Sequence, residues 1–516
     1  MSGPKILIDT NVFIGLEDEK EVAPELAAMQ QACGKHGVRI FVHEAALQDI
    51  RRDADVQRRA VSLSKVKKFE TLKGVHQPSR DELCSRFGTI NRRNDEVDVA
   101  LLHALDLGVV DFLVTQDQGI HARARRASPP VSDRVLTVGD ALNWLRATYE
   151  PQEVRLPLIQ EVPAHAIPLT DEIFDSLRKG YPGFDKWWRE KCVANHRPCW
   201  VVTIEGELAG LVVRKDESHA EAQTKNKAAK VLKVCTFKVK PQFRGEKLGE
   251  QLLKQVLWFA QKNRYDLTYV TTFSDQTVLI GLLDYFGFEM TGTNAVGELI
   301  YEKPLSTRKL EANDGVDLFQ LARLNYPRFV ARPPAEAFYV PIRGEYHDVL
   351  FPEMALRMQP DLFQAAGLTL AGAGPRTPGN TIRKVYLCRA RTKALKPGHI
   401  LVFYRSLSPS YVASQSITSI GIVEAVNEAS NLDTLLRLTA KRSVYSTQQL
   451  NEILAASTEP VKVIDFLLVG HLEPVVPLTT LVSEGVFLPR PPQSICHLSP
   501  NQFKPSRRRM NFGFDV

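Results

Sequence analysis

Short apolar runs alternate with longer amphipathic segments through the first third of the chain. Four of these runs have the length and composition of buried strands: Lys5–Ile8, Arg39–Val42, Phe112–Thr115 and Val135–Val138. Glu96–Leu107 and Gly139–Leu145 instead have the apolar spacing of helices. Because strands and helices alternate, we expect a parallel α/β sandwich in this part of the chain.

The middle of the chain shows a strand, a glycine-bearing loop and a helix in direct succession. Cys235–Val239 alternates like a strand, Pro241–Gly249 has the composition of a loop, and Glu250–Ala260 carries its apolar residues on one helical face. Glycines let a backbone approach a ligand closely, and the free N–H groups of a first helical turn attract phosphate. This pattern therefore predicts an anion site. Thr268–Phe273 and Val278–Tyr285 follow as a predicted strand and a short helix.

The last third has the pattern of a β-rich domain. Lys384–Arg389, Ile400–Tyr404 and Ser419–Val426 are predicted strands, and the turn Lys396–Gly398 separates the first two. Before them, Asp361–Leu370 is a predicted helix and Gly372–Gly379 a Gly/Pro-rich loop.

Composition adds bounds to this picture. The 516 residues are 44% hydrophobic and 24% charged, as in ordinary globular proteins, and the length favours two to four domains. We see no signal peptide and no apolar run long enough to span a bilayer. The seven cysteines are scattered without a C-x-x-C pair, which favours a reducing, cytoplasmic compartment. Cys192, His196 and Cys199 lack a fourth ligand at a suitable spacing, so zinc is disfavoured.

The net charge of +7 is concentrated late in the chain. Residues 306–516 hold 24 basic and 17 acidic side chains, and Pro375–Arg405 holds eight basic residues and no acidic one. Arg51–Arg93 holds twelve basic residues against five acidic ones, and Lys504–Arg509 adds four positive charges. Basic surface of this kind predicts a nucleic-acid partner, with a merely solvated basic face as the alternative.

Acidic residues follow the predicted strands of the first third. Four of them are expected to converge on one edge of the sheet: Asp9, Asp49, Asp98 and Asp117, with Asp95 one helical turn before Asp98 and Glu44 as an alternative to Asp49. Carboxylates brought together repel one another, and hard cations such as Mg²⁺ or Mn²⁺ neutralise them. The alternative for each acid alone is a helix cap or a solvated carboxylate.

These acids lie in segments that resemble PIN-domain ribonucleases: IDTNVF, LQDI, NDEVDVALLHA and LVTQDQG, across residues 1–147. The resemblance implies a metal-dependent endoribonuclease of the kind found among toxin nucleases. Asp9, Asp49, Asp98 and Asp117 would be catalytic, and Asp9, Asp98 and Asp117 would hold Mg²⁺ or Mn²⁺.

The middle segment resembles the GNAT acetyltransferases from about Leu156 to Leu305, in its loop and in its later Gly287–Phe288 ending. Gln242, Gly245 and Lys247 fall on the family's acetyl-CoA loop, and Arg244 and Gly249 fit its wider form. The resemblance implies acetyl-CoA contacts from these residues: Phe237, Val239, Gln242, Arg244, Gly245, Glu246, Lys247, Leu248, Gly249 and Gln276.

Two positions depart from the GNAT pattern. Lys247 replaces a small residue where the pyrophosphate passes, and it would either clash with the cofactor or contact its phosphate. Leu283 stands where the family often has a tyrosine that acts as general acid, and Tyr285 lies on a different helical face. The alternative to an active transferase is therefore a GNAT fold kept as a scaffold or ligand sensor. Trp187 and Trp188 are expected near the substrate side, with core packing as the alternative.

The last third resembles the small barrels of the PUA-like superfamily, in its ASCH or EVE branches, over residues 335–490. That resemblance implies an RNA-binding β barrel. Tyr404, Arg405 and Ser406 would line its groove, and Arg389 and Arg391 would lie near phosphates.

The sequence thus predicts a multidomain α/β protein. Its expected parts are a PIN-like nuclease at 1–150, a GNAT-like acetyltransferase at 151–305 and a PUA-like nucleic-acid-binding domain at 306–516. The first hypothesis is a bifunctional enzyme acting on RNA such as tRNA, with a toxin or stress-response role; an antitoxin or a second copy of the chain would be a further partner. The second is a regulatory nucleic-acid-binding protein in which one or both catalytic domains are degenerate.

Overall fold

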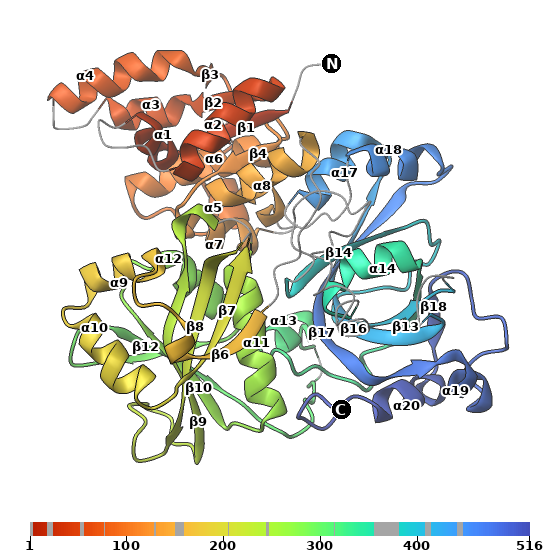
Figure 1. Cartoon of the computed structure of the whole chain (residues 1–516). Helices are drawn as coiled ribbons and strands as arrows, with labels where there is room; N and C mark the ends of the chain where they lie inside the picture. The colour runs from red at the N-terminus through yellow and green to blue at the C-terminus, as the bar shows by residue number, and fades with distance from the viewer. Residues whose placement is uncertain are drawn as a thin grey trace.

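The structure is a computed structural model (Figure 1). It describes residues 4–17, 24–51, 56–76, 78–127, 131–149, 159–204, 206–243, 247–313, 315–354, 381–407, 414–440 and 447–516. These residues form three sheets with helices around them. None of the described helices is long and apolar enough to cross a membrane.

The N-terminal sheet is parallel throughout, with the strand order β3-β2-β1-β4-β5. Its strands are β1 (Lys5–Ile8), β2 (Arg39–His43), β3 (Glu70–Leu72), β4 (Phe112–Val114) and β5 (Val135–Leu136). The helices are α1 (Thr10–Glu17), α2 (Pro24–His36), α3 (Glu44–Ile50), α4 (Val56–Lys65), α5 (Arg80–Phe87), α6 (Arg93–Asp106), α7 (Gln118–Arg126) and α8 (Val138–Tyr149). The four predicted strands are confirmed, whereas β3 was not predicted because its three residues carry no apolar pattern.

The middle sheet is mixed, with the strand order β11-β12-β10-β9-β8-β7-β6. Its strands are β6 (Ile159–Pro163), β7 (Pro198–Ile204), β8 (Glu207–Ser218), β9 (Lys230–Val239), β10 (Leu267–Thr272), β11 (Glu289–Thr293) and β12 (Leu299–Pro304). The helices are α9 (Asp175–Gly180), α10 (Phe184–Trp187), the π-helical η5 (Trp188–Val193), α11 (Leu248–Lys262) and α12 (Thr277–Tyr285). Leu252, Leu253, Val256 and Leu257 form the predicted buried face of α11.

The C-terminal sheet has the strand order β14-β17-β16-β15-β13-β18. Its strands are β13 (Ala337–Ile342), β14 (Arg383–Cys388), β15 (Ile400–Arg405), β16 (Ser416–Ala429), β17 (Val461–Pro477) and β18 (Cys496–Leu498). The helices are α13 (Leu318–Leu324), α14 (Gly344–Leu350), α17 (Leu432–Thr439), α18 (Thr447–Ala455), α19 (Leu478–Ser483) and α20 (Pro500–Arg508). Among the described residues β14 and β18 do not pair, so the sheet is open and the expected closed barrel is not found. The predicted helix Asp361–Leu370 and loop Gly372–Gly379 lie outside the described residues.

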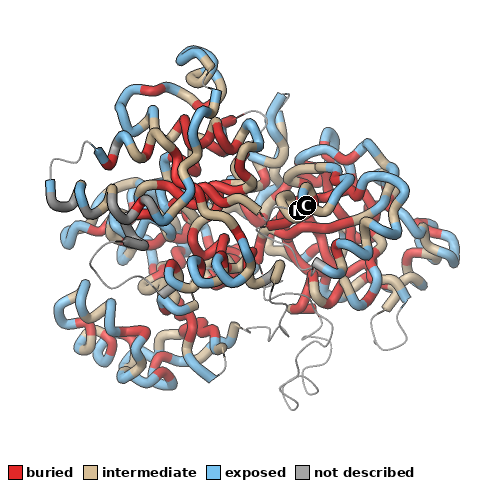
Figure 2. The backbone as a smooth tube through the Cα atoms, turned by 90° about the horizontal axis from the view of Figure 1, so that it is seen from above, coloured by how far each residue is buried: buried red, intermediate tan, exposed pale blue. Residues whose placement is uncertain are grey.

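One hydrophobic cluster joins the middle and C-terminal sheets. Tyr326, Ile382 and Leu467 pack in the same buried cluster as the apolar face of α11. The Tyr326 hydroxyl accepts a hydrogen bond from Trp258 Nε1 at 2.7 Å and donates one to Leu468 O at 2.7 Å. Figure 2 shows that buried residues follow the strands, whereas exposed residues lie on outer helices and loops. Helix α11 is therefore held from both sides.

Candidate functional site

Strands β9 and β10 separate halfway along their length. They pair in parallel only from Val231/Leu267 to Val234/Val270, although both strands continue further. Beyond that point β9 stays paired with β8, and a bulge interrupts this pairing at Val213/Arg214. The separation leaves one edge of β9, from Cys235 onward, where an extended ligand can form backbone hydrogen bonds.

Helix α11 starts beside the end of β9. Its N-cap residue, Lys247, has left-handed backbone angles (φ 59°) and makes no side-chain capping bond. The first N–H groups of a helix have no partner within the helix, and with the helix dipole they attract anions. The open edge of β9 and the start of α11 together fit a long ligand that carries a pyrophosphate, as acetyl-CoA does.

The predicted cofactor residues occupy this region with different exposures. Phe237 and Val239 are half-buried on β9, and Gly249 is half-buried in the first turn of α11. Leu248 is buried in the core, so only its backbone faces a ligand. Gln242 is exposed and donates to Glu207 Oε2 at 3.3 Å.

One further predicted cofactor residue lies at the margin of the site. Gln276 is the exposed N-cap of α12, and its side chain donates to Asp275 at 3.2 Å. Arg244, Gly245 and Glu246 lie outside the described residues.

The side chain of Lys247 does not extend into the space beside α11. Its ammonium group forms an ion pair with Asp140 in the first turn of α8, on the N-terminal domain. Asp140 and Thr137 also bond each other's backbone N–H groups. A Cβ added to Gly281 would lie 2.9 Å from Gln118 Oε1, so α7 packs directly on α12, as Figure 1 shows. The N-terminal domain therefore contacts the edge of the predicted cofactor site.

A core residue, Leu283, stands at the position where the GNAT family often has its general acid. Leu283 is fully buried. The ring of Tyr285 lies between two guanidinium groups, 4.6 Å from Arg323 and 4.9 Å from Arg383. Arg383 in turn pairs with Glu424. Tyr285 therefore lies at the junction with the C-terminal domain. This agrees with the prediction that it points to a different face of the helix from Leu283.

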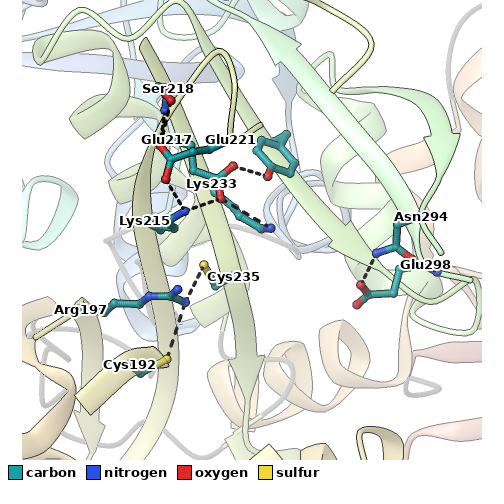
Figure 3. A network of polar contacts seen from close by, with 11 residues as sticks. Cys192, Arg197, Lys215, Glu217, Ser218, Glu221, Lys233, Cys235, Asn294 and Glu298 are labelled. Atoms are coloured by element: carbon teal, nitrogen blue, oxygen red, sulfur yellow. Dashed lines mark hydrogen bonds and ion pairs between the residues drawn. The ribbon is translucent and has the colours of Figure 1, made fainter. Parts of the chain in front are cut away.

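A different tyrosine lies next to the separated strands. The ring of Tyr181 packs on Phe273, which directly follows β10, with 5.3 Å between ring centroids. Its hydroxyl donates to Glu298 Oε1 at 2.5 Å. Asn294 donates to Glu298 Oε2 at 2.7 Å (Figure 3). Burial and the bond to Glu298 raise the pKa of Tyr181. Sequence reasoning missed this pair because its members are 117 residues apart.

A polar network surrounds Cys235 on the other side of the site (Figure 3). Arg197 Nη1 lies 3.9 Å from Cys192 Sγ and 3.6 Å from Cys235 Sγ. Trp188 is buried in the core, which is the alternative that the sequence left open for the two tryptophans. The guanidinium carbon of Arg197 lies 5.7 Å from the centre of the Trp187 ring.

The predicted acids of the N-terminal domain lie within electrostatic range of one another. Burial, together with the charges of Asp117 and Asp9, raises the pKa of Asp98 to about 7. Asp9 accepts a hydrogen bond from Thr115 Oγ1 at 2.7 Å, and Asp117 caps α7 through the amide of Gly119 at 2.6 Å. Asp117 is therefore a helix cap, which was the alternative to a catalytic role for each acid.

The same acids do not form a metal centre in the described part of the chain, where no group of His, Cys, Asp and Glu fits a metal ion. Asp95 pairs with Arg123 at 3.1 Å, a neutralising cation that sequence spacing did not reveal. Glu44 accepts the amide of Gly74 at 3.1 Å. The side chain of Asp49 lies outside the description. The described side chains therefore give no support to the expected Mg²⁺ or Mn²⁺.

The basic stretch of the C-terminal domain is largely neutralised or buried. Arg405 is 1% exposed and pairs with Asp348 at 2.9 Å, and Tyr404 is 1% exposed in the core, 5.3 Å from the ring of Tyr339. The structure therefore corrects the expectation that Tyr404 and Arg405 line a groove. All residues of β15 are buried, so both faces of the sheet are covered at this strand. The sequence pattern of the strand does not show that both faces are covered.

Arg389 and Arg391 are exposed, as expected of phosphate contacts. Arg389 donates to Ala456 O at 2.7 Å, and Arg391 pairs with Glu459 at 3.0 Å. Arg383 and Lys384 instead bond groups of the protein interior, Glu424 and Leu350 O. Arginines of Pro375–Arg405 thus pair with acidic residues that are distant in the sequence.

Comparison with known proteins supports the middle domain directly. Residues 165–288 match the model of the acetyltransferase (GNAT) family. They form a GNAT acetyltransferase domain, and the resemblance expected from the sequence is confirmed over this range. No curated protein matches the chain.

Solved structures of two kinds are similar to parts of the chain. An ASCH protein mutant (S128A) from Zymomonas mobilis has 14% identity, covers 34% of this chain and 96% of its own, and has a TM-score of 0.23. An N-acetyltransferase from Thermoplasma acidophilum in complex with coenzyme A has 15% identity, covers 29% and 98%, and has a TM-score of 0.23. A ribosomal-protein-alanine N-acetyltransferase from Brucella melitensis has 17% identity, covers 29% and 99%, and has a TM-score of 0.24.

Proposed function

We propose that the chain is an acetyl-CoA-dependent N-acetyltransferase whose site lies between β9, β10 and the start of α11. The observation that carries this proposal is the separation of β9 from β10 after Val234 and Val270, directly beside a helix start without a side-chain cap. Bound acetyl-CoA would supply the activated acetyl group. The backbone of β9 and the first turn of α11 would hold and orient it.

Glu298 and Tyr181 supply the acid–base chemistry in this proposal. Glu298 takes a proton from the acceptor amine as its nitrogen bonds to the acetyl carbon and the carbon–sulfur bond breaks. The Tyr181 hydroxyl then gives a proton to the leaving thiolate sulfur. The position of the Tyr181 hydroxyl beside the separated strands supports this role, and the hydroxyl carries its proton at neutral pH as an ordinary tyrosine does.

The test is release of free thiol from acetyl-CoA by the full chain with a panel of primary amines, with acetylated amine identified by mass spectrometry. The proposal predicts saturable thiol release and an acetylated product. Binding of acetyl-CoA without any turnover would leave the scaffold or sensor hypothesis in its place.

Cleavage of RNA by the N-terminal domain is a second candidate. It is supported by the raised pKa of Asp98 beside Asp9 and Asp117, because carboxylates are seldom gathered in this way without a role. RNA as the partner, with exposed Arg389 and Arg391 as contacts, belongs to this candidate. A nuclease assay of the full chain and its Asp98→Asn variant tests it. Equal cleavage by the two proteins would eliminate it.

A further inference from the structure

A cavity of about 370 Å³ opens at the start of β7, beside the proposed transferase site. Four of the side chains that line it are cationic and one is acidic: Lys191, Arg197, Arg214 and Lys215, with Asp216. A concave surface with this balance of charge attracts anions, because the walls exclude water and strengthen the field inside.

Two of these cations have carboxylate partners and two do not. Lys215 pairs with Glu217 at 3.1 Å, and Arg214 pairs with Glu161 at 3.0 Å. Within the described part of the chain, no carboxylate lies within ion-pair distance of Lys191 or Arg197. The charge that is left over therefore belongs to Lys191 and Arg197.

The thiols around Arg197 do not neutralise it. Burial raises the pKa of Cys192 to about 12 and also raises that of Cys235, so both sulfurs stay protonated at neutral pH. The guanidinium group contacts them and the ring of Trp187, none of which carries a negative charge. A planar guanidinium without a counter-ion matches the oxygens of a phosphate or carboxylate.

Arg197 also connects the cavity with the place where acetyl transfer would occur. Its Nη1 atom lies 3.6 Å from the sulfur of Cys235, and Cys235 is the first residue of β9 beyond the pairing with β10 (Figure 3). An anionic group held by Arg197 and Lys191 would thus lie beside the separated strands.

We infer that this cavity binds the anionic group of the acyl acceptor, and that the acceptor is an amine carrying a phosphate or carboxylate. The inference rests on the proposed transferase function and specifies its substrate class. Arg197 and Lys191 hold the anion, and Arg214 and Lys215, already paired, complete the basic wall.

Calorimetric titration of the full chain tests the inference, with inorganic phosphate and then acetate as probes at constant ionic strength. Saturating coenzyme A fills the cofactor's own phosphate site beforehand. Arg197→Ala should weaken binding of the preferred anion at least tenfold and Lys191→Ala about fivefold, because each removes an unpaired cation. Arg189→Ala is the matched control: Arg189 is exposed on the same helix, does not line the cavity, and its loss should change nothing.

Preferential binding of phosphate or of acetate identifies the anionic group of the acceptor. Binding that is equal in wild-type protein, Arg197→Ala and Lys191→Ala would overturn the inference, as would no heat with either anion. Because Lys191 is exposed, its variant folds even if Arg197→Ala does not. Coenzyme A is titrated first, and the absence of a binding heat in this titration would contradict the transferase function. The anion titration that follows tests only whether the cavity binds an anion.

Discussion

Asp140, in the first turn of α8, forms an ion pair with Lys247, the residue immediately before α11. The pair joins the N-terminal domain to the proposed acetyl-CoA site. It also bears on the two outcomes expected for Lys247 from the sequence: a carboxylate from another domain holds the side chain, so a contact between Lys247 and a phosphate requires this ion pair to break.

This ion pair predicts that the N-terminal domain weakens cofactor binding. Asp140→Asn keeps the bond to the Thr137 amide but removes the charge that competes for Lys247 and repels phosphate. Acetyl-CoA should bind about fivefold more tightly, as expected for a charge contribution near 1 kcal/mol at a partly exposed site. Titration calorimetry measures the change, and Asp81→Asn, an exposed acid on α5, should behave like wild type. Unchanged affinity in Asp140→Asn would show that the ion pair is only structural.

The Tyr181–Glu298 pair predicts a selective loss of turnover. Tyr181→Phe removes the hydroxyl while keeping the ring on Phe273, so kcat for thiol release should fall about 100-fold, within the range for a lost general acid. KM for acetyl-CoA should change less than about twofold, because the backbone of β9 and α11 carries binding. Tyr285→Phe is the control, since Tyr285 lies at the junction between Arg323 and Arg383. Equal rates in the two variants would exclude Tyr181 from the chemistry.

The sequence predicted those parts of the site whose residues are close together along the chain. The order of strand, loop and helix around Cys235–Ala260 is local, and it was sufficient to locate the start of α11 to within two residues. The partners of Lys247 and Tyr181 are 107 and 117 residues away, and no local pattern points to them. Sequence therefore predicted where a ligand lies along the chain better than which side chains surround it.

The C-terminal domain shows the same limit for charge. Eight basic residues in Pro375–Arg405 suggested a continuous phosphate surface because no acid lies among them. Asp348 and Glu424 lie outside that window and neutralise Arg405 and Arg383. The three predicted strands are found as β14, β15 and β16 because their apolar pattern is local, whereas β13, β17 and β18 were not predicted. The expected barrel closure depends on how distant strands pair.

Arg405 and Tyr404 are therefore predicted to act on stability. Arg405→Met leaves Asp348 buried without its partner and should cost about 3–5 kcal/mol of unfolding free energy. Tyr404→Ala should cost a similar amount by leaving a cavity. Chemical denaturation measures both, with Arg391→Ala, whose side chain is 82% exposed, expected within about 0.5 kcal/mol of wild type. Loss of RNA binding without loss of stability in Tyr404→Ala would restore the groove role.

Asp98 predicts a pH-dependent effect on stability. Its pKa in the folded chain, about 7, lies above its ordinary value of 3.8, so folding favours the protonated form and stability falls as pH rises between these values. Asp98→Asn should therefore stabilise the protein at pH 8 by about 1–2 kcal/mol, allowing for partial exposure, and have no effect near pH 3.5. Thermal unfolding at the two pH values tests this. A variant that is destabilised at pH 8 would mean that the carboxylate is paired rather than crowded.

The proposed function depends on binding of acetyl-CoA to the start of α11, which titration calorimetry with Gly249→Asp measures. A carboxylate in the first turn of a helix favours the helix dipole, so the variant should fold, yet it repels the cofactor's phosphates. Gly292→Asp adds the same charge on β11, where no atom lies within 4 Å of the new Cβ. We expect one acetyl-CoA per chain for wild type and Gly292→Asp, and at least tenfold weaker binding for Gly249→Asp. Equal binding by all three proteins, or no heat at millimolar acetyl-CoA, would contradict this expectation.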